Sequence, residues 1–263
     1  MSGRAIRLQQ LINPESGRSF IVAFDHGQSL PIVKGLGNPV ELLGKIIDGG
    51  VEGILLNRGM LEQASDLFAR PGAPAPILRA DWTPLDKAMK EELGEAHRII
   101  TTPEEALRLG ASAVCVYLIG RPKADQMFFD NVEGVADYIS RAHAIGLPVI
   151  VEATLWGLRN EDLKDAERLR TMCRIAAELG ADAIKTEYVG DVEAERTIIE
   201  EVGNIPVFTL GGAAASRESV KQAAQDAISA GATGLIFGRN VWQAEDMPAV
   251  INDLNEILHG AQA

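Results

Sequence analysis

The segment Gly180-Ala181-Asp182-Ala183-Ile184-Lys185-Thr186 decides the fold class of this chain. It begins with a glycine after a helical pattern, continues as a short apolar run, and reaches a lysine near its end. An apolar run this short, between a helix and a turn, is typical of a buried strand in a parallel sheet. The same unit recurs along the chain, which predicts a sheet built from repeated strand–helix pairs.

The repeated unit occurs eight times. The predicted strands span residues 20–24, 53–56, 77–80, 113–118, 148–152, 181–186, 206–210 and 234–238. The predicted helices span residues 39–48, 60–68, 103–109, 132–145, 165–179, 192–202, 217–230 and 247–258. Eight strands that each precede a helix predict an α/β fold, a single (β/α)8 TIM barrel. Because such a barrel needs about 250 residues and no linker divides the chain, we expect one domain over residues 1–263.

The predicted helices carry the residues that commonly begin and end helices. Thr102 and Ser216 precede two of them, each with an acidic residue in the first turn. The stretch 82–100 is long, irregular and charged, and we expect a functional loop with a short solvated helix there. A glycine that can cap the last turn in a left-handed conformation follows five helices, within Asp48-Gly49-Gly50 and at Gly110, Gly146, Gly180 and Gly231.

The composition excludes several classes of function. A net charge of −12 argues against nucleic-acid binding, which requires a basic surface. No apolar run reaches the roughly 18 residues of a membrane span, and the N-terminus lacks the apolar core of a signal peptide, so we expect a cytoplasmic protein. Cys115 and Cys173 are expected to be reduced core residues. The chain has four histidines and no Cys/His cluster with zinc spacing, so we expect no metal and no other cofactor.

Polar residues gather at the carboxyl ends of the predicted strands, where barrel enzymes carry their active sites. Lys185 stands at such an end, after the apolar residues of its strand. A lysine amine in this position can attack a carbonyl carbon and form an imine. The alternative is a lysine that extends to the surface or pairs with Asp182 or Glu187.

Carboxylates and other proton-transfer groups accompany this lysine. Asp25 follows the first strand and Glu152 ends the fifth, and each can move protons beside an imine-forming amine. Asp25 is equally well explained as a turn cap, and Glu187 is better explained as a solvated residue. His26 is a candidate base or substrate contact. Tyr117 can donate a hydrogen bond to a substrate oxygen.

The last two strands end in glycines, within Thr209-Leu210-Gly211-Gly212-Ala213 and Ile236-Phe237-Gly238-Arg239-Asn240. In barrels the loops after strands seven and eight commonly hold phosphate, because glycines let backbone N–H groups and the next helix N-terminus approach an anion. Arg58, Arg79 and Arg121 are secondary anion contacts that can equally pair with carboxylates. The predicted phosphate-binding residues are Gly211, Gly212, Gly238 and Arg239.

These segments resemble the archaeal-type (DhnA-type) class I fructose-bisphosphate aldolases, a family that includes phospho-autoinducer thiolase and the aminodideoxyheptulosonate synthases. The resemblance covers roughly residues 10–258. It implies a TIM barrel, a Schiff-base lysine at Lys185, an acidic partner at Asp25, the phosphate site above, and a ring-shaped homo-oligomer, often a decamer. The motifs that carry it are Phe24-Asp25-His26-Gly27, Asn57-Arg58-Gly59, the segment ending at Lys185, Leu210-Gly211-Gly212 and Gly238-Arg239-Asn240-Val241-Trp242-Gln243.

One segment departs from that family. The fructose-bisphosphate enzymes carry a Trp-x-Tyr pattern after strand five, and here Glu152-Ala153-Thr154 stands in its place. Thr154 therefore replaces the proton-transfer tyrosine, which argues against fructose 1,6-bisphosphate itself as the substrate. Glu152 is the leading replacement for proton transfer, and Tyr117 is the second. Glu187 replaces the second lysine of the usual Lys-x-Lys segment.

The sequence thus predicts a class I, metal-independent aldolase that cleaves or forms a C–C bond in a phosphorylated ketose or related sugar phosphate. One alternative is an acyltransferase or thiolase that acts on a phosphorylated diketone with the same lysine. Another is a sugar-phosphate isomerase or epimerase without imine chemistry. A metal-assisted enzyme at Asp25, His26 and Glu152, and a non-catalytic sugar-phosphate binder, are further alternatives. The expected partners are a small phosphorylated substrate and further copies of the chain.

Overall fold

Eight parallel strands close into a barrel in the computed structural model, which describes residues 2–30 and 33–260. Around the barrel the strand order is β1-β10-β9-β8-β7-β6-β3-β2. This order confirms the predicted (β/α)8 TIM barrel. The strands are β1 Ser19–Ala23, β2 Gly53–Leu56, β3 Ala75–Arg79, β6 Ala113–Ile119, β7 Val149–Thr154, β8 Ala183–Glu187, β9 Val207–Leu210 and β10 Gly234–Phe237.

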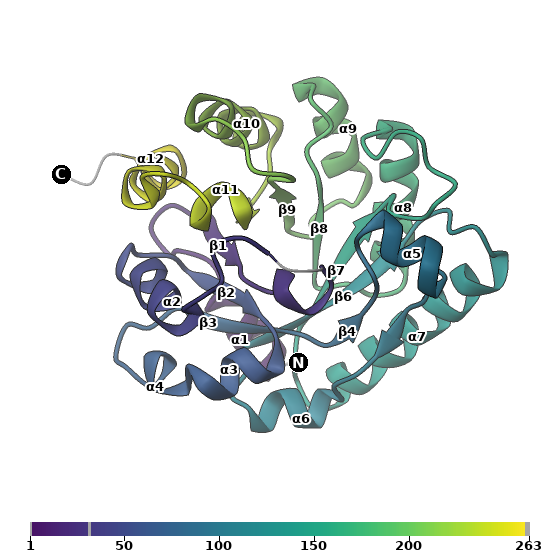
Figure 1. Ribbon diagram of the computed structural model, residues 1–263, viewed down its shortest axis with the longest axis horizontal. Coiled ribbons are helices and arrows are strands. Elements are labelled where there is room, and N and C mark those ends of the chain that lie inside the picture. The colour runs from purple at the N-terminus through teal and green to yellow at the C-terminus, as the bar shows by residue number, and fades with distance from the viewer. Residues whose placement is uncertain (1, 31–32, 261–263) are drawn as a thin grey trace.

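Helices surround the strands as an outer ring (Figure 1). They are α1 Ser2–Gln9, α2 Pro39–Asp48, α3 Arg58–Gln63, α4 Ser65–Phe68, α5 Lys87–Leu93, α6 Pro103–Arg108, α7 Asp125–Ala144, α8 Ala166–Glu178, α9 Val192–Glu201, α10 Arg217–Ala230, α11 Arg239–Trp242 and α12 Met247–His259. The predicted helix at 60–68 is split into α3 and α4. Helix α7 begins seven residues before the predicted start at 132, because its first turns are mostly exposed and carry little apolar pattern.

The core has two parts. Apolar residues on the outward side of the strands pack against the helices, and those on the inward side fill the barrel. The sequence did not predict α1, which precedes β1. Leu8, Leu11 and Ile12, in and just after α1, pack against the barrel interior. The interior is therefore sealed by apolar side chains from the N-terminal segment, and the chemistry is confined to the opposite, carboxyl-terminal end.

The local signals at the helix ends are confirmed. Thr102 forms a capping box with Glu105 at the start of α6, and Ser216 caps α10. The long segment 82–100 contains the predicted short helix, α5, and also one element that was not predicted. This element is an antiparallel hairpin of β4 Asp81–Trp82 and β5 Arg98–Ile99. Left-handed glycines follow the five helices where they were expected, at Gly50, Gly110, Gly146, Gly180 and Gly231.

Candidate active site

Three candidate residues lie side by side on adjacent strands. Tyr117 of β6 is the register partner of Glu152 of β7, and Glu152 is the register partner of Lys185 of β8. Two residues earlier on these strands, Cys115, Ile150 and Ala183 belong to the barrel interior. Because strand side chains alternate between two faces, the three candidates also point inward, at the carboxyl-terminal end.

Glu152 binds a cation with each of its oxygens. Its Oε1 lies 2.8 Å from the Lys185 ammonium, and its Oε2 accepts a hydrogen bond from Arg79. Glu152 and Lys185 are 1% and 5% exposed, so the pair is shielded from water. A buried carboxylate that contacts the amine can accept its proton, which is the first requirement for a nucleophilic lysine.

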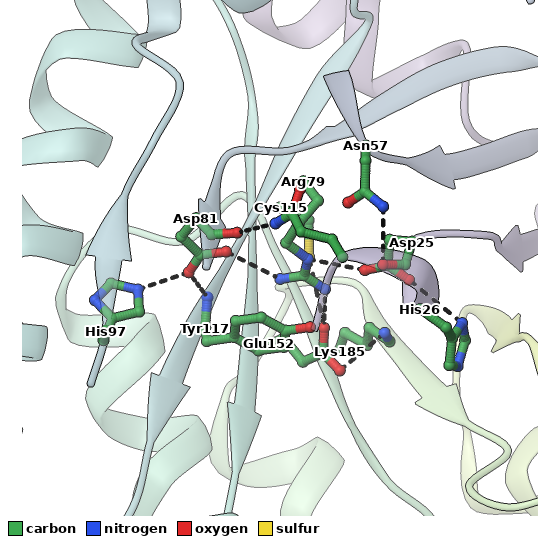
Figure 2. A network of polar contacts seen from close by, with 11 residues as sticks. Asp25, His26, Asn57, Arg79, Asp81, His97, Cys115, Tyr117, Glu152 and Lys185 are labelled. Atoms are coloured by element: carbon green, nitrogen blue, oxygen red, sulfur yellow. Dashed lines mark hydrogen bonds and ion pairs between the residues drawn. The ribbon is translucent and has the colours of Figure 1, made fainter. Parts of the chain in front are cut away.

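Arg79 is the centre of a buried ionic network (Figure 2). Its Nε donates to Asp25 at 2.9 Å, and Nη1 lies 3.4 Å from Asp81. Its guanidinium carbon is 3.7 Å from the centre of the Tyr117 ring, in a cation–π contact. Burial alone lowers the pKa of Arg79, but the surrounding groups hold it well above its usual range. Arg79 therefore pairs with carboxylates, as one of the two sequence interpretations stated, and does not serve as an anion contact. Its position at the centre of the network was not predicted.

Asp25 is held ionised. Burial alone raises its pKa, but Arg79 and Lys185 together keep the pKa at about 2. The Asp25 side chain makes no capping hydrogen bond to the short 3-10 helix that follows, so the turn-cap interpretation is wrong. The next residue, His26, has Nδ1 3.7 Å from the Asp25 carboxylate. Burial lowers the pKa of His26 to about 4, so its ring is neutral near pH 7.

The β4–β5 hairpin contributes buried side chains that hold this network in place. Asp81 of β4 is fully buried and accepts hydrogen bonds from the Tyr117 backbone N–H and from His97 Nε2, at 2.7 Å for the histidine. Asp81 and Asp25 thus restrain the guanidinium of Arg79 from two sides. Sequence reasoning gave neither residue a role. Asp81 was only one of several polar residues at the end of the third strand, and His97 lies in the segment 82–100, which was expected to be largely irregular.

The glycine-rich loops lie at the same end of the barrel. A Cβ on Gly211 would come within 2.6 Å of Asn240 Nδ2, and one on Gly238 within 2.4 Å of His26 Cε1. At Gly238 the added Cβ would also come within 2.8 Å of the Ala23 carbonyl oxygen, so the backbone would have to shift, whereas at Gly211 the Asn240 side chain would have to move. Arg239 is half-buried, burial lowers its pKa, and its Nε has no hydrogen-bond partner among the described residues. Such a cation in a predominantly acidic chain is suited to an anionic ligand.

A cavity of about 690 Å³ connects the two parts of the site. The described cavity lining contains none of the three predicted secondary anion contacts, Arg58, Arg79 and Arg121. The half-exposed side chain of Arg58 pairs with Glu62 and Glu105. Its assignment as a substrate contact is therefore corrected. A larger cavity, of about 870 Å³, lies at the opposite end of the barrel, and Glu52 is the one charged residue among its described lining. The candidate residues that line the first cavity are Asp25, His26, Tyr117, Glu152, Lys185, Gly211, Gly212, Gly238 and Arg239.

Two further expectations are corrected at this cavity. Glu187 was expected to be solvated, but it is 5% exposed and lines the cavity, because β8 continues through it and keeps it on the same face as Lys185. Asp182 does not pair with Lys185, since its carboxylate binds Arg4 and His143. Thr154, which stands at the sequence position of the family's tyrosine, is fully buried and is not part of the described cavity lining, so it is not placed to transfer a proton to a substrate there.

Other sequence expectations concern the cysteines, metal ligands and membrane spans. Cys115 and Cys173 are free and buried, as predicted. Within residues 2–30 and 33–260, no three His, Cys, Asp or Glu side chains are grouped as a metal site would require. No helix in the described part of the chain is long and apolar enough to cross a membrane.

Fold and site together define a barrel enzyme with its chemistry at the carboxyl ends of the strands. Comparison with known proteins narrows this class. The chain belongs to the DeoC/LacD family of aldolases, whose family model matches residues 19–244. It is thus a carbon–carbon lyase, and the resemblance stated from the sequence is confirmed.

Individual relatives match over nearly the whole chain. An uncharacterized aldolase of Saccharolobus solfataricus is 30% identical over 98% of this chain and 95% of its own length. The 2-amino-4,5-dihydroxy-6-oxo-7-(phosphonooxy)heptanoate synthase of Streptomyces griseus is 28% identical, over 98% and 91%. An archaeal fructose 1,6-bisphosphate aldolase structure has 26% identity and a TM-score of 0.82, over 97% of this chain and 99% of that chain. A second structure of such an enzyme, equally similar, holds the substrate's carbinolamine intermediate covalently on its catalytic lysine.

Proposed function

We propose that this aldolase acts on a phosphorylated ketose or a closely related keto compound, with Lys185 as the residue that forms the imine. The observation that carries the assignment is the contact between the buried Lys185 amine and the Glu152 carboxylate, 2.8 Å apart in a cavity that Arg239 also lines. An amine whose proton is taken up by an adjacent base can attack a ketone. A cation in the same cavity can bind a phosphate group on that ketone.

The catalytic sequence follows from the positions of these groups. Lys185 transfers a proton to Glu152 and attacks the ketone carbon, and loss of water leaves a protonated imine. The imine withdraws electrons as the adjacent C–C bond breaks. The β-hydroxyl proton passes to Glu152, which has by then given up the proton that it took from Lys185. Asp25, ionised near the Lys185 amine, orients a substrate hydroxyl or the forming imine. Burial keeps the Tyr117 pKa well above its usual range, so its phenol acts as a hydrogen-bond donor.

The names of two relatives indicate the substrate class. One relative acts on fructose 1,6-bisphosphate, and the other makes a 6-oxo-7-(phosphonooxy)heptanoate. Both compounds contain a ketone next to a carbon that bears phosphate. We infer the same unit in the substrate of this protein, so that dihydroxyacetone phosphate is the simplest compound that tests the site.

Trapping with borohydride tests the proposed lysine. Incubation with dihydroxyacetone phosphate and sodium borohydride is expected to reduce the imine to a stable secondary amine on Lys185. Peptide mass spectrometry should locate the adduct there. The reference is the same treatment with dihydroxyacetone, which lacks the phosphate and should give much less adduct. An adduct on another lysine, or none at all, would contradict the assignment.

The phosphate contact is tested at Arg239. Replacing Arg239 with methionine is expected to raise the half-saturating concentration of dihydroxyacetone phosphate in the trapping reaction by about 10- to 100-fold. A charge-assisted hydrogen bond contributes about 1.5–3 kcal/mol, which corresponds to that range. Arg58→Met is the matched control and should leave this concentration unchanged, since Arg58 lies outside the cavity. If the two substitutions raise the half-saturating concentration equally, Arg239 is not the residue that binds the phosphate.

The cytoplasmic location and the homo-oligomeric assembly, with a decamer as the leading candidate, are also part of this proposal. They are supported by the sequence and by the family resemblance. Light scattering on the purified protein measures the number of subunits directly.

A further inference from the structure

Glu187 is a buried acid whose role the mechanism above leaves open. It lies two residues after Lys185 on β8, on the same face, and lines the same cavity. It is 5% exposed, and neither of its carboxyl oxygens has a hydrogen-bond partner among the described residues. The side chain of Trp156 is nearby but does not reach hydrogen-bond geometry. Unpartnered buried polar groups are rare and commonly mark a position where a ligand binds.

The environments of Glu187 and Glu152 are opposite. Glu152 has a cation on each oxygen, from Arg79 and Lys185, whereas no cation of the described residues binds a carboxyl oxygen of Glu187. Burial, followed by the negative charge of Glu152, raises the pKa of Glu187 to about 8, and Lys185 offsets this only in part. Glu187 is therefore protonated near pH 7, beside the Glu152 carboxylate, which contacts two cations. Two neighbouring acids in opposite environments are the arrangement that divides acid and base roles in enzymes.

We propose that Glu187 is the general acid that expels water during imine formation. This inference rests on the proposed function, because it requires the carbinolamine on Lys185. The Glu187 carboxylic acid gives its proton to the carbinolamine hydroxyl, the C–O bond breaks, and water leaves. The nitrogen lone pair forms the C=N bond, and the iminium carries the positive charge. The proton that Glu152 took from Lys185 then passes to Glu187, so Glu152 can accept the next proton when the C–C bond reacts. Imine hydrolysis reverses each step, and Glu187 recovers its proton.

The other acids of the cavity are less suited to this step. Asp25, with a pKa of about 2, and His26, with a pKa of about 4, have lost their protons at neutral pH. Tyr117 retains its proton too strongly, because burial raises its pKa. A general acid works best when its pKa lies near the working pH. Among these groups, Glu187 alone meets that condition.

Exchange of the carbonyl oxygen isolates the step. Dihydroxyacetone phosphate labelled with ¹⁸O at its ketone loses the label to water each time an imine forms and hydrolyses, whether or not a C–C bond reacts. Glu187→Gln keeps the size of the neutral side chain but has no acidic proton. It is expected to slow enzyme-dependent exchange by about 100-fold or more, the usual contribution of a general acid, with little change in the half-saturating concentration.

The matched control is Glu195→Gln. Glu195 of α9 is also a buried acid, and burial raises its pKa to about 7, but it bonds to Thr209 and Val189 outside the cavity. Its substitution should leave exchange within a few-fold of wild type. Exchange in Glu187→Gln at the wild-type rate would overturn the inference, while a borohydride adduct on wild-type Lys185 would still support the proposed function. Absence of that adduct would instead refute the proposed function.

The pH profile of the wild-type protein provides a second test without any substitution. Exchange should fall as the pH rises through about 8, where Glu187 loses its proton, and Glu187→Gln should lack this fall. A fall at the same pH in both proteins would assign it to another group and overturn the inference. The charged and titratable groups on the surrounding walls are Asp25, His26, Asp86, Lys87, Lys90, Tyr117, Glu152, Glu161, Lys164, Lys185 and Arg239.

Discussion

Replacing Lys185 with methionine is expected to lower aldol cleavage by on the order of 10⁴-fold or more, because removal of a covalent nucleophile abolishes its pathway. Methionine matches the length of the lysine stem and stays buried, so the barrel should remain folded. Glu152 then keeps Arg79 as its cation. The measurement is the rate of carbonyl product formation from a phosphorylated ketose, with circular dichroism to verify the fold.

Lys45→Met is the control for this substitution, since Lys45 is an exposed lysine of α2 that pairs with Glu41. It should retain wild-type activity. A Lys185→Met protein with substantial activity would rule out an imine on this residue. Solvent hydrogen exchange into the substrate without cleavage would then indicate an isomerase or epimerase that uses the carboxylates alone.

The second large effect is expected at Arg79. Replacing it with methionine should lower the free energy of unfolding by about 3–5 kcal/mol at neutral pH, the range for breaking a buried ion pair. The reason is that Asp25, Asp81 and Glu152 would keep their burial but lose their shared cation. Urea unfolding measures the change. Arg58→Met is the control, and as an exposed pair it should cost about 1 kcal/mol or less.

The loss of stability in Arg79→Met should depend on pH in a defined direction. In the wild-type protein the Asp25 pKa is lowered from its ordinary value of 3.8 to about 2. A lowered carboxyl pKa contributes stability that is present above the ordinary pKa and lost as the pH falls through the lowered value. Arg79→Met lacks this contribution. The stability difference between the two proteins should thus narrow between about pH 4 and pH 2, and a constant difference would refute the ionic explanation.

Local sequence patterns were sufficient to predict the barrel strands and the glycines that follow the helices. Apolar runs of strand length and left-handed glycines depend on residues that are near one another in the chain, so their positions could be predicted without the fold. The inward direction of Lys185 also follows from strand alternation. Glu187 was expected to be solvated, and its burial follows from the continuation of β8 to this residue. Helix α1 was not predicted. The apolar residues in and after it, such as Leu11, pack against residues of several strands, and these long-range contacts leave no local pattern in the sequence.

The ionic network could not be predicted in the same way. Arg79 contacts Asp25 and Glu152, which are 54 and 73 positions away in the chain. Its neighbour Asp81 is placed by a hairpin that the sequence did not indicate. No local pattern encodes which of several arginines and carboxylates will meet. Arg58 and Arg79 looked equivalent in the sequence, yet one is exposed on α3 and the other is buried at the centre of the site.

The sequence by itself determined the eight-stranded barrel, the place of Lys185 on the sixth of its strands, and the glycines after the last two strands. These features depend on residue size, periodicity and backbone freedom, which are properties of short segments. Only the tertiary structure decided the protonation states of the site. A pKa depends on burial and on charges within a few ångströms, and the groups that act on Glu187 and Asp25 include Glu152 and Arg79, from other strands. The closed barrel brings these groups together, and their proximity protonates Glu187 and keeps Asp25 ionised near pH 7.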